Sequence, residues 1–229
     1  MNRSNGNRLM DSLALENIDI TLEGAPLLRI DTVIAPGDVL TIMGPSGVGK
    51  STLLAYIAGF LGPPFSAQGT VRLGDRSLND LPAEARRMGL LFQDALLFPH
   101  LSVGGNLAFG MISGGSRRER RRRIEAALAD VGLPGYAKRD PATLSGGQQT
   151  RVALLRVLLS EPRAMLLDEP FSKLDTALRD DMRALVFTRV REHGLPTLMV
   201  THDAADAAAA GGPVIELADG AASQQTHPR

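Results

Sequence analysis

GPSGVGKST, residues Gly44–Thr52, is the stretch of this chain that decides its fold. It matches the pattern G-x-x-x-x-G-K-[ST] from Gly44 through Ser51, and it follows the short apolar run Val39–Met43. The glycines let the backbone wrap so that successive N–H groups point inward, and the helix that follows adds the positive end of its dipole. Such a loop binds phosphate groups. By itself it predicts a nucleoside triphosphate and leaves kinases, GTPases and motor proteins open.

Two further segments narrow that choice. LSGGQ covers Leu144–Gln148, and AMLLDEP covers Ala164–Pro170. In the second segment an apolar strand would deliver Asp168 and Glu169 at its carboxyl end, which is where ligands bind in open α/β sheets. An Asp-Glu pair before proline is by itself an ordinary solvated strand end. Beside a phosphate-binding loop the pair instead predicts a magnesium ligand in Asp168 and a general base in Glu169.

With these three segments in place, the chain resembles the ATP-binding cassette (ABC) ATPases over about residues 13–220. Gln93 in LLFQD lies where the family has its Q-loop glutamine, and Ser172–Asp175 (SKLD) lies where it has its D-loop. His202 in MVTHD follows the next apolar strand, as the family's switch histidine does. Within the family the chain resembles ATPase subunits of bacterial importers for thiamine, iron, anions and other small solutes, and also the Ynj-type cassettes.

The resemblance implies a role for each motif. The residues that it implies bind ATP are Gly44, Pro45, Ser46, Gly47, Val48, Gly49, Lys50, Ser51 and Thr52. Those implied to hold Mg²⁺ are Ser51, Gln93 and Asp168. Those implied to be catalytic are Glu169, His202 and Gln93. The signature residues implied to bind the ATP of a second copy are Ser145, Gly146, Gly147 and Gln148, with the D-loop residue Asp175 at the interface.

The rest of the sequence predicts an α/β fold, which under the resemblance is a P-loop NTPase of the RecA-like type. Alternating strands and helices predict a mostly parallel sheet with helices on both faces, after an antiparallel β subdomain at the N-terminus. A helical subdomain is expected at 94–144, inserted in a single domain at 13–220, with flexible tails at 1–12 and 221–229. Strands are predicted at 13–22, 27–34, 39–43, 70–73, 89–92, 164–167, 197–200 and 214–217. A helix is predicted at about 50–60, and Gly62-Pro63-Pro64 would end it. Three further helices are predicted: one that starts after Gly146, one at about 176–192, and a short Ala-rich helix before the last strand.

Composition excludes several classes of protein. Among the 229 residues, 25 Lys and Arg balance 25 Asp and Glu, so no overall basic field argues for nucleic acid. The chain has no cysteine, which excludes disulfides and thiolate metal sites. No apolar run approaches the roughly 18 residues of a spanning helix, and the start lacks the apolar core of a signal peptide. We therefore expect a soluble protein, and we expect any channel to come from another chain.

Some segments depart from the family pattern or stand out by charge. Thr21–Gly24 lacks the aromatic residue that usually stacks on adenine, so we expect looser base selectivity. Lys173 replaces a small residue, and Gln149–Arg151 is less basic than usual. The run Arg117–Arg123 has two interpretations: the exposed first turns of a helix, or a contact with anionic lipid headgroups. The apolar stripe that follows, Ile124, Leu128 and Val131, favours the exposed helix.

Under the resemblance, the chain is the ATP-hydrolysing subunit of an importer. It would form a homodimer with ATP and work with two transmembrane permease subunits and a solute-binding protein, without nucleic acid. Its place would be peripheral, on the cytoplasmic face of the inner membrane. One alternative is an export or lipid-extraction ATPase. Another is a soluble cassette in repair, translation or cofactor assembly, but repair cassettes carry a coiled-coil or zinc insertion and translation factors carry two cassettes, and this sequence shows neither. No regulatory domain is expected after Gly220, and the transported solute is not encoded in this chain.

Overall fold

The computed structural model of the chain describes residues 11–217 and 225–226. Its internal contacts divide it into two compact units. The first unit contains the described residues up to Leu90, together with Arg163–Glu169 and the residues from Phe187 onward. The second unit contains Leu91–Pro162 and Pro170–Val186. The tails predicted at 1–12 and 221–229 lie outside the described residues, except for residues 11–12 and a two-residue strand at Gln225–Thr226.

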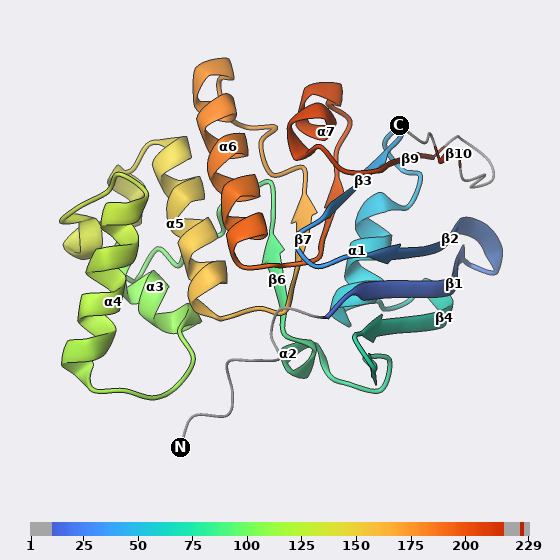
Figure 1. Cartoon of the computed structure of the whole chain (residues 1–229), viewed down its shortest axis with the longest axis horizontal. Helices are drawn as coiled ribbons and strands as arrows, with labels where there is room; N and C mark the ends of the chain where they lie inside the picture. The colour runs from blue at the N-terminus through green and yellow to red at the C-terminus, as the bar shows by residue number, and fades with distance from the viewer. Residues whose placement is uncertain (1–10, 218–224, 227–229) are drawn as a thin grey trace. The chain divides into compact units, whose positions relative to one another are not determined.

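The first unit begins with a four-stranded antiparallel sheet in the order β2-β1-β4-β5 (Figure 1). Its strands are β1 (Leu13–Leu22), β2 (Ala25–Ile34), β4 (Phe65–Leu73) and β5 (Arg76–Ser77). Apolar residues alternate along β1, so that Leu13 and Leu15 share one face and are fully buried. A short helix, α2 (Ala83–Arg86), follows this sheet. The predicted antiparallel subdomain is confirmed; of its four strands, β5 was not predicted, and β4 begins earlier than the predicted strand at 70–73.

The second sheet has the order β10-β9-β3-β8-β7-β6. Its strands are β3 (Val39–Met43), β6 (Met88–Leu91), β7 (Ala164–Asp168), β8 (Thr197–Val200), β9 (Val214–Glu216) and β10 (Gln225–Thr226). Strand β3 pairs in parallel with β8 and β9, and β7 pairs in parallel with β8. The residues of β8 are all buried, as expected of a central strand covered on both faces. The predicted α/β fold with a mostly parallel sheet is confirmed.

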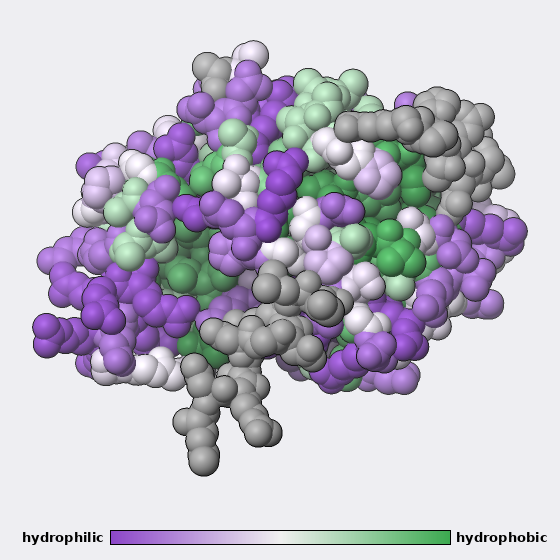
Figure 2. Space-filling model, viewed as in Figure 1, coloured by the Kyte–Doolittle hydropathy of each residue, from purple (hydrophilic) through white to green (hydrophobic). Residues whose placement is uncertain are grey.

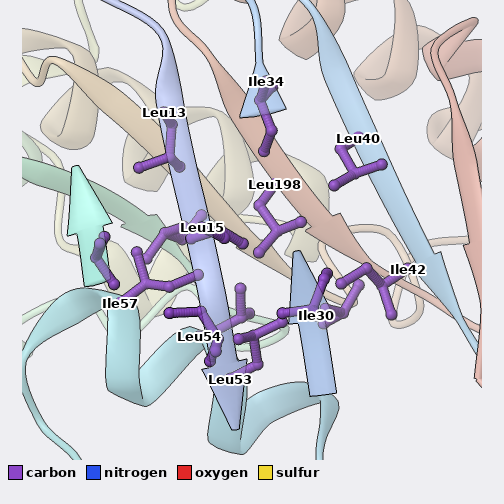
Figure 3. Packing of buried hydrophobic residues seen from close by; sticks show 14 of the residues in the cluster. Leu13, Leu15, Ile30, Ile34, Leu40, Ile42, Leu53, Leu54, Ile57 and Leu198 are labelled. Atoms are coloured by element: carbon purple, nitrogen blue, oxygen red, sulfur yellow. The ribbon is translucent and has the colours of Figure 1, made fainter. Parts of the chain in front are cut away.

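The core of the first unit lies around α1 (Lys50–Ala58). Figure 3 shows side chains from β1, β2, β3 and β8 converging with those of α1. The helix ends at Ala58 because Gly59 takes a left-handed conformation (φ +88°) and donates its N–H to Ala55 and Tyr56. The prediction that the helix reaches Phe60 and stops at Gly62-Pro63-Pro64 was therefore wrong. The last described helix of this unit is α7 (Ala204–Ala210).

The second unit is helical. Its elements are α3 (Val103–Gly110), α4 (Arg117–Asp130), the 3₁₀ helices η1 (Tyr136–Lys138) and η2 (Pro141–Thr143), and α5 (Gly146–Leu159). Val103, Leu107, Leu128 and Val152 form the centre of its core and are fully buried. The unit also contains the first turns of α6 (Thr176–Glu192). In the described part of the chain, no helix is long and apolar enough to cross a membrane.

Candidate functional site

The loop between β3 and α1 has the backbone that phosphate binding requires. Gly47 and Gly49 take positive φ values of +86° and +96°, which a residue with a side chain rarely adopts. A Cβ atom at Gly49 would lie 3.0 Å from Cγ of Leu27, whereas one at Gly47 would meet no atom within 4 Å. The loop is thus closed on the side of Leu27 and open at Gly47. Gly47 is exposed, so the backbone of the loop is uncovered at this position.

Lys50, the first residue of α1, places its charge inside this loop. Its side chain is buried, and Nζ donates hydrogen bonds of 2.7 Å to the carbonyl oxygens of Gly44 and Pro45. These bonds hold the ammonium group against the first two residues of the loop. Because the N-terminus of α1 also carries a partial positive charge, the field at the loop favours an anion.

Ser51 and Asp168 bring the end of β7 to the start of α1. The Ser51 hydroxyl donates a hydrogen bond of 3.2 Å to Oδ1 of Asp168. Burial raises the pKa of Asp168; the Ser51 hydrogen bond opposes the rise, the charge of Glu169 adds to it and that of Lys50 opposes it. The Asp168 carboxylate is therefore under-solvated and would gain from a nearby cation.

Glu169 follows β7 in a strained backbone conformation. Its φ is +45°, in the left-handed region that residues other than glycine seldom occupy. The conformation is held by a hydrogen bond from the Glu169 N–H to the Val200 carbonyl (3.0 Å). Oε1 of Glu169 lies 3.1 Å from Nδ1 of His202, so the two predicted catalytic side chains are in contact. Strain of this kind concentrates at functional sites, and here it sets the direction of a carboxylate.

A buried hydrogen-bond network behind His202 was missed by the sequence reasoning. Thr201 and Asp206 are almost fully buried, and the Thr201 hydroxyl donates a bond of 2.8 Å to Oδ2 of Asp206. The same hydroxyl accepts a bond of 3.1 Å from the N–H of Asp203. The network fixes the backbone on both sides of His202. Its signal in the sequence was Asp206, the one polar residue of the helix AADAAAA.

In the second unit, LSGGQ forms the start of α5. Ser145 is the N-cap: its hydroxyl accepts a bond from the Gln148 N–H (3.4 Å), and the Gln148 side chain accepts one from the Ser145 N–H (3.1 Å). This bond uses one acceptor position of the Ser145 hydroxyl, and the hydroxyl proton remains to be donated. A Cβ at Gly146 would meet no atom within 4 Å, while one at Gly147 would lie 2.0 Å from Leu178.

The other predicted residues of the second unit lie in loops. Gln93 is exposed and lies two residues after the end of β6. Asp175 precedes α6, and its carboxylate accepts a hydrogen bond of 3.0 Å from the Leu178 N–H. Lys173 forms an ion pair with Asp94. The first unit therefore brings together the phosphate-binding loop, Asp168, Glu169 and His202, and the second unit carries Gln93, the signature residues and Asp175.

The segment that lacks the expected adenine-stacking aromatic residue, Thr21–Gly24, lies at the end of β1. Leu22 ends β1 and is paired in register with Phe65 of β4. Residues directly opposite each other in an antiparallel pair have their side chains on the same face of the sheet. An aromatic ring therefore does lie beside Leu22, on a strand that the sequence reasoning began five residues too late, at Thr70 rather than Phe65.

Comparisons with known proteins agree with this geometry. The family model described as ABC transporter matches residues 27–172. The chain is similar to "Uncharacterized ABC transporter ATP-binding protein YnjD" of Escherichia coli K12, with 47% identity over 195 residues, which are 85% of this chain and 90% of that protein. It is 45% identical to an Fe(3+) ions import ATP-binding protein, FbpC, of Mesorhizobium japonicum, over 90% of this chain and 57% of that protein. It is 42% identical to a spermidine/putrescine import ATP-binding protein, PotA, of Marinobacter nauticus, over 95% of this chain. The chain spans 58% of that PotA protein and 57% of the FbpC protein, which is little more than half of each.

Proposed function

Because the chain belongs to the ABC transporter family, we propose that it is the ATP-hydrolysing subunit of a bacterial importer. The observation that carries this proposal is the arrangement at the end of β7. There Asp168 contacts Ser51 of the phosphate-binding loop, and Glu169 contacts His202. A binding module would need the loop alone, whereas a carboxylate placed next to it supplies the chemistry of hydrolysis.

ATP is the substrate that fits the loop. Backbone N–H groups of residues 44–52 and the Lys50 ammonium would bind its phosphates, and the open side of Gly47 admits them. The donor set also fits Mg²⁺, which proteins usually hold with one or two carboxylates together with substrate phosphates. Ser51 and Asp168 would hold the ion with Gln93, and the ion would neutralise charge on the phosphates. The under-solvated Asp168 carboxylate is suited to that role.

Glu169 would act as the general base. Its carboxylate would accept a proton from the attacking water as the new bond to the γ-phosphorus forms and the bond from that phosphorus to the bridging oxygen breaks, with ADP as the leaving group. His202, held at 3.1 Å from this carboxylate, would orient it and contact the γ-phosphate. Gln93 would complete the arrangement around the water. The buried Thr201–Asp206 pair would keep His202 in place through the backbone.

The signature residues would serve a second copy of the chain. Ser145, Gly146, Gly147 and Gln148 stand at the N-terminus of α5, where a hydroxyl proton, backbone N–H groups and the helix dipole favour an anion. We propose that they bind the γ-phosphate of ATP held by the other copy, in a homodimer that carries Asp175 at its interface. Hydrolysis would remove this bridge and let the dimer open.

The partners of the dimer would be two transmembrane permease subunits and a solute-binding protein. The relatives named as import ATP-binding proteins for Fe(3+) ions and for spermidine or putrescine support import over export. The chain would then lie against the cytoplasmic face of the cell membrane. The balanced charge of the chain gives no support for nucleic acid as a partner. Export or lipid extraction is the second candidate function, which co-purification of a permease pair without a solute-binding protein would favour.

The test of the proposed chemistry is Glu169→Gln, which keeps the shape of the side chain and removes the base. We expect hydrolysis to fall by about 100-fold or more, with ATP binding retained. Lys50→Ala should instead lose tight ATP binding, because it removes the ammonium group that would contact the phosphates. Glu84→Gln, which changes an exposed carboxylate on α2, is the matched control and should leave both unchanged. Full ATPase activity in Glu169→Gln would show that the water is activated elsewhere.

A further inference from the structure

The loop after β6 carries Gln93, whose side chain has no hydrogen-bond partner among the described residues. Residues 92–98 of this loop form neither helix nor strand. The place of Gln93 therefore depends on the contacts that hold the loop on each side of it. On one side the loop leaves β6 at Leu91. On the other side, three side chains of the second unit hold it, and they differ in kind.

Two of these three anchors belong to the helices of the second unit. Asn106 of α3 is fully buried, and its side chain accepts a hydrogen bond from the Phe98 N–H (2.8 Å) and donates one to the Phe98 carbonyl (3.1 Å). Arg156 of α5 is partly buried and donates to the carbonyls of Ala95 (3.1 Å) and Leu96 (2.8 Å). Breaking such bonds would leave polar groups without a partner, so these two anchors fix the far end of the loop.

The third anchor is the one nearest to Gln93. Asp94, the next residue, forms an ion pair with Lys173, which lies in the loop before α6. The side chain of Asp94 is 61% exposed and that of Lys173 is 51% exposed, and each is the only ion-pair partner of the other among the described residues. An exposed pair opens easily and adds little to the stability of a protein. Of the three anchors, this one can therefore change without unfolding the loop.

The loop that carries Lys173 is held on both sides of that residue. Arg179, in the first turn of α6, donates hydrogen bonds to the carbonyls of Ser172 (3.4 Å) and Leu174 (3.1 Å). Asp175 ends the loop, and its carboxylate caps the start of α6. Because one guanidinium group holds the backbone before and after Lys173, a displacement of the loop at Asp175 moves Lys173 as well.

We propose that Lys173 is a positioning residue, which sets the place of Gln93 through the ion pair with Asp94. A second copy that contacts Asp175 would displace the loop of Lys173, and the ion pair would pass that displacement to the residue next to Gln93. This inference rests on the proposed roles of Gln93 in hydrolysis and of Asp175 at the dimer interface. It adds the route by which the second copy acts on hydrolysis in the first.

The experiment measures steady-state ATP hydrolysis by the full chain. Lys173→Ala should lower kcat by about threefold, the scale of one exposed ion pair, and should leave KM for ATP nearly unchanged. Asp94→Ala should give the same loss, and the two substitutions together should lose no more than either alone, because both remove the same contact. Lys173→Arg keeps the pair and should keep most of the activity. The exchange of Lys173→Asp with Asp94→Lys should recover part of it.

The matched control is Arg123→Ala, which removes another exposed ion pair of the second unit. Arg123 lies on α4, over which Figure 2 shows a hydrophilic surface, and it pairs with Glu161 at 3.3 Å. This variant should keep the wild-type kcat. Thermal unfolding of each variant measures stability, and we expect Lys173→Ala to shift the thermal midpoint by less than about 4 °C. An equal loss of kcat in Arg123→Ala would show a general effect of surface charge and would overturn the proposal.

Gln93→Ala distinguishes a positioning role from any other role of Lys173. In that background Lys173→Ala should cause no further loss, because no glutamine side chain remains to be placed. The same threefold loss in that background, or an unchanged kcat in Lys173→Ala alone, would overturn the proposal. Full activity in Gln93→Ala together with its loss in Glu169→Gln would overturn this inference and leave the proposed function standing. Full activity in Glu169→Gln would instead count against the proposed catalytic base.

Discussion

The two carboxylates at the end of β7 each lie in an environment that destabilises the folded state. Asp168 is held where burial disfavours its charge, and Glu169 is held in a left-handed backbone conformation. Each arrangement opposes folding, the first through desolvation and the second through strain of about 1 kcal/mol or more. The first places an acceptor oxygen against Ser51 of the phosphate-binding loop, and the second places one against His202. The fold around β7 must therefore supply the stability that these residues do not.

The raised pKa of Asp168 makes a prediction about pH. Its contribution to stability is fully present below the ordinary aspartate pKa of about 4 and is lost as the pH rises through the raised value. Asp168→Asn, which cannot ionise, should therefore raise the thermal midpoint at neutral pH, with a gain that shrinks as the pH falls towards 4. Thermal unfolding in the presence of a chelator measures this. A gain that grows on acidification would contradict the desolvation of Asp168.

At this scale the sequence predicted chemical roles but not the contacts that hold the side chains. The spacing of Lys50, Asp168 and His202 predicted their roles, because phosphate and metal chemistry admits few residue types, and these roles stay predictions. The left-handed backbone of Glu169 and the bond from Thr201 to Asp206 were not predicted. Neither has a sequence pattern, since both result from the way β7, β8 and α7 meet in three dimensions. The sequence therefore proposes which side chains take part in the chemistry, and the packing decides how they are held.

At the scale of elements, the N-terminus of α5 separates a structural glycine from a functional one. Gly147→Ala should destabilise the protein by about 1–3 kcal/mol, because its methyl group would overlap Leu178. Gly146→Ala meets no atom and should leave stability nearly unchanged, yet it should lower ATPase activity by obstructing the proposed second phosphate site. Urea unfolding and steady-state hydrolysis measure the two effects. Equal destabilisation by both alanines would contradict the packing described here, and full activity in Gly146→Ala would contradict the site.

Helix α7 offers a second prediction, through its one acidic residue. Asp206→Ala should cost about 1–3 kcal/mol of stability, because the buried Thr201 hydroxyl loses its acceptor. We expect kcat to fall while KM for ATP changes little, since His202 loses its support and the phosphate-binding loop does not. Asp206→Asn keeps an acceptor oxygen and should recover part of both losses. A change in KM alone would mean that Asp206 acts on nucleotide binding instead.

The boundaries of elements were predictable where local signals agree. The ranges of β1, β3, α6 and β8 were predicted from alternating or continuous apolar runs between clear breaks. The start of β4 was missed, because the strand was predicted only from Thr70. In the structure Gly69 lies within the strand with φ +95°, opposite Asn17, where the β1–β4 register shifts. A bulge of this kind depends on both strands, so one strand's sequence does not reveal it.

For the whole molecule, the decisive prediction concerns the dimer. The chain carries a phosphate-binding loop in one unit and the signature residues in the other, and the proposal pairs each with its counterpart in a second copy. Glu169→Gln should therefore accumulate as a dimer in Mg-ATP, as seen by size-exclusion chromatography. Adding Ser145→Arg should abolish that dimer. Adding Ser116→Arg removes an equivalent helix cap from α4 and should leave the dimer intact, which separates lost capping from a blocked site.

A monomer in every sample could mean that the membrane subunits are needed for closure, so the comparison is repeated with the permease present. If the complex forms equally well with and without Ser145→Arg, the signature is not a second phosphate site. The division of the fold into two units was only partly visible in the sequence. The helical run at 94–144 predicted the second unit, but α5 and the start of α6 join it through buried contacts that no local pattern reports.

The strain at the end of β7 has a consequence for anyone who tries to improve this protein. Replacing Glu169 with glycine would remove the left-handed strain, and replacing Asp168 with asparagine would remove the buried charge. Laboratory evolution for heat resistance alone should therefore enrich changes at these two positions and deliver robust proteins that no longer turn over ATP. A useful campaign would therefore have to select for the proposed transport function at the same time. The pattern of its forbidden substitutions would then map the catalytic centre without a biochemical assay.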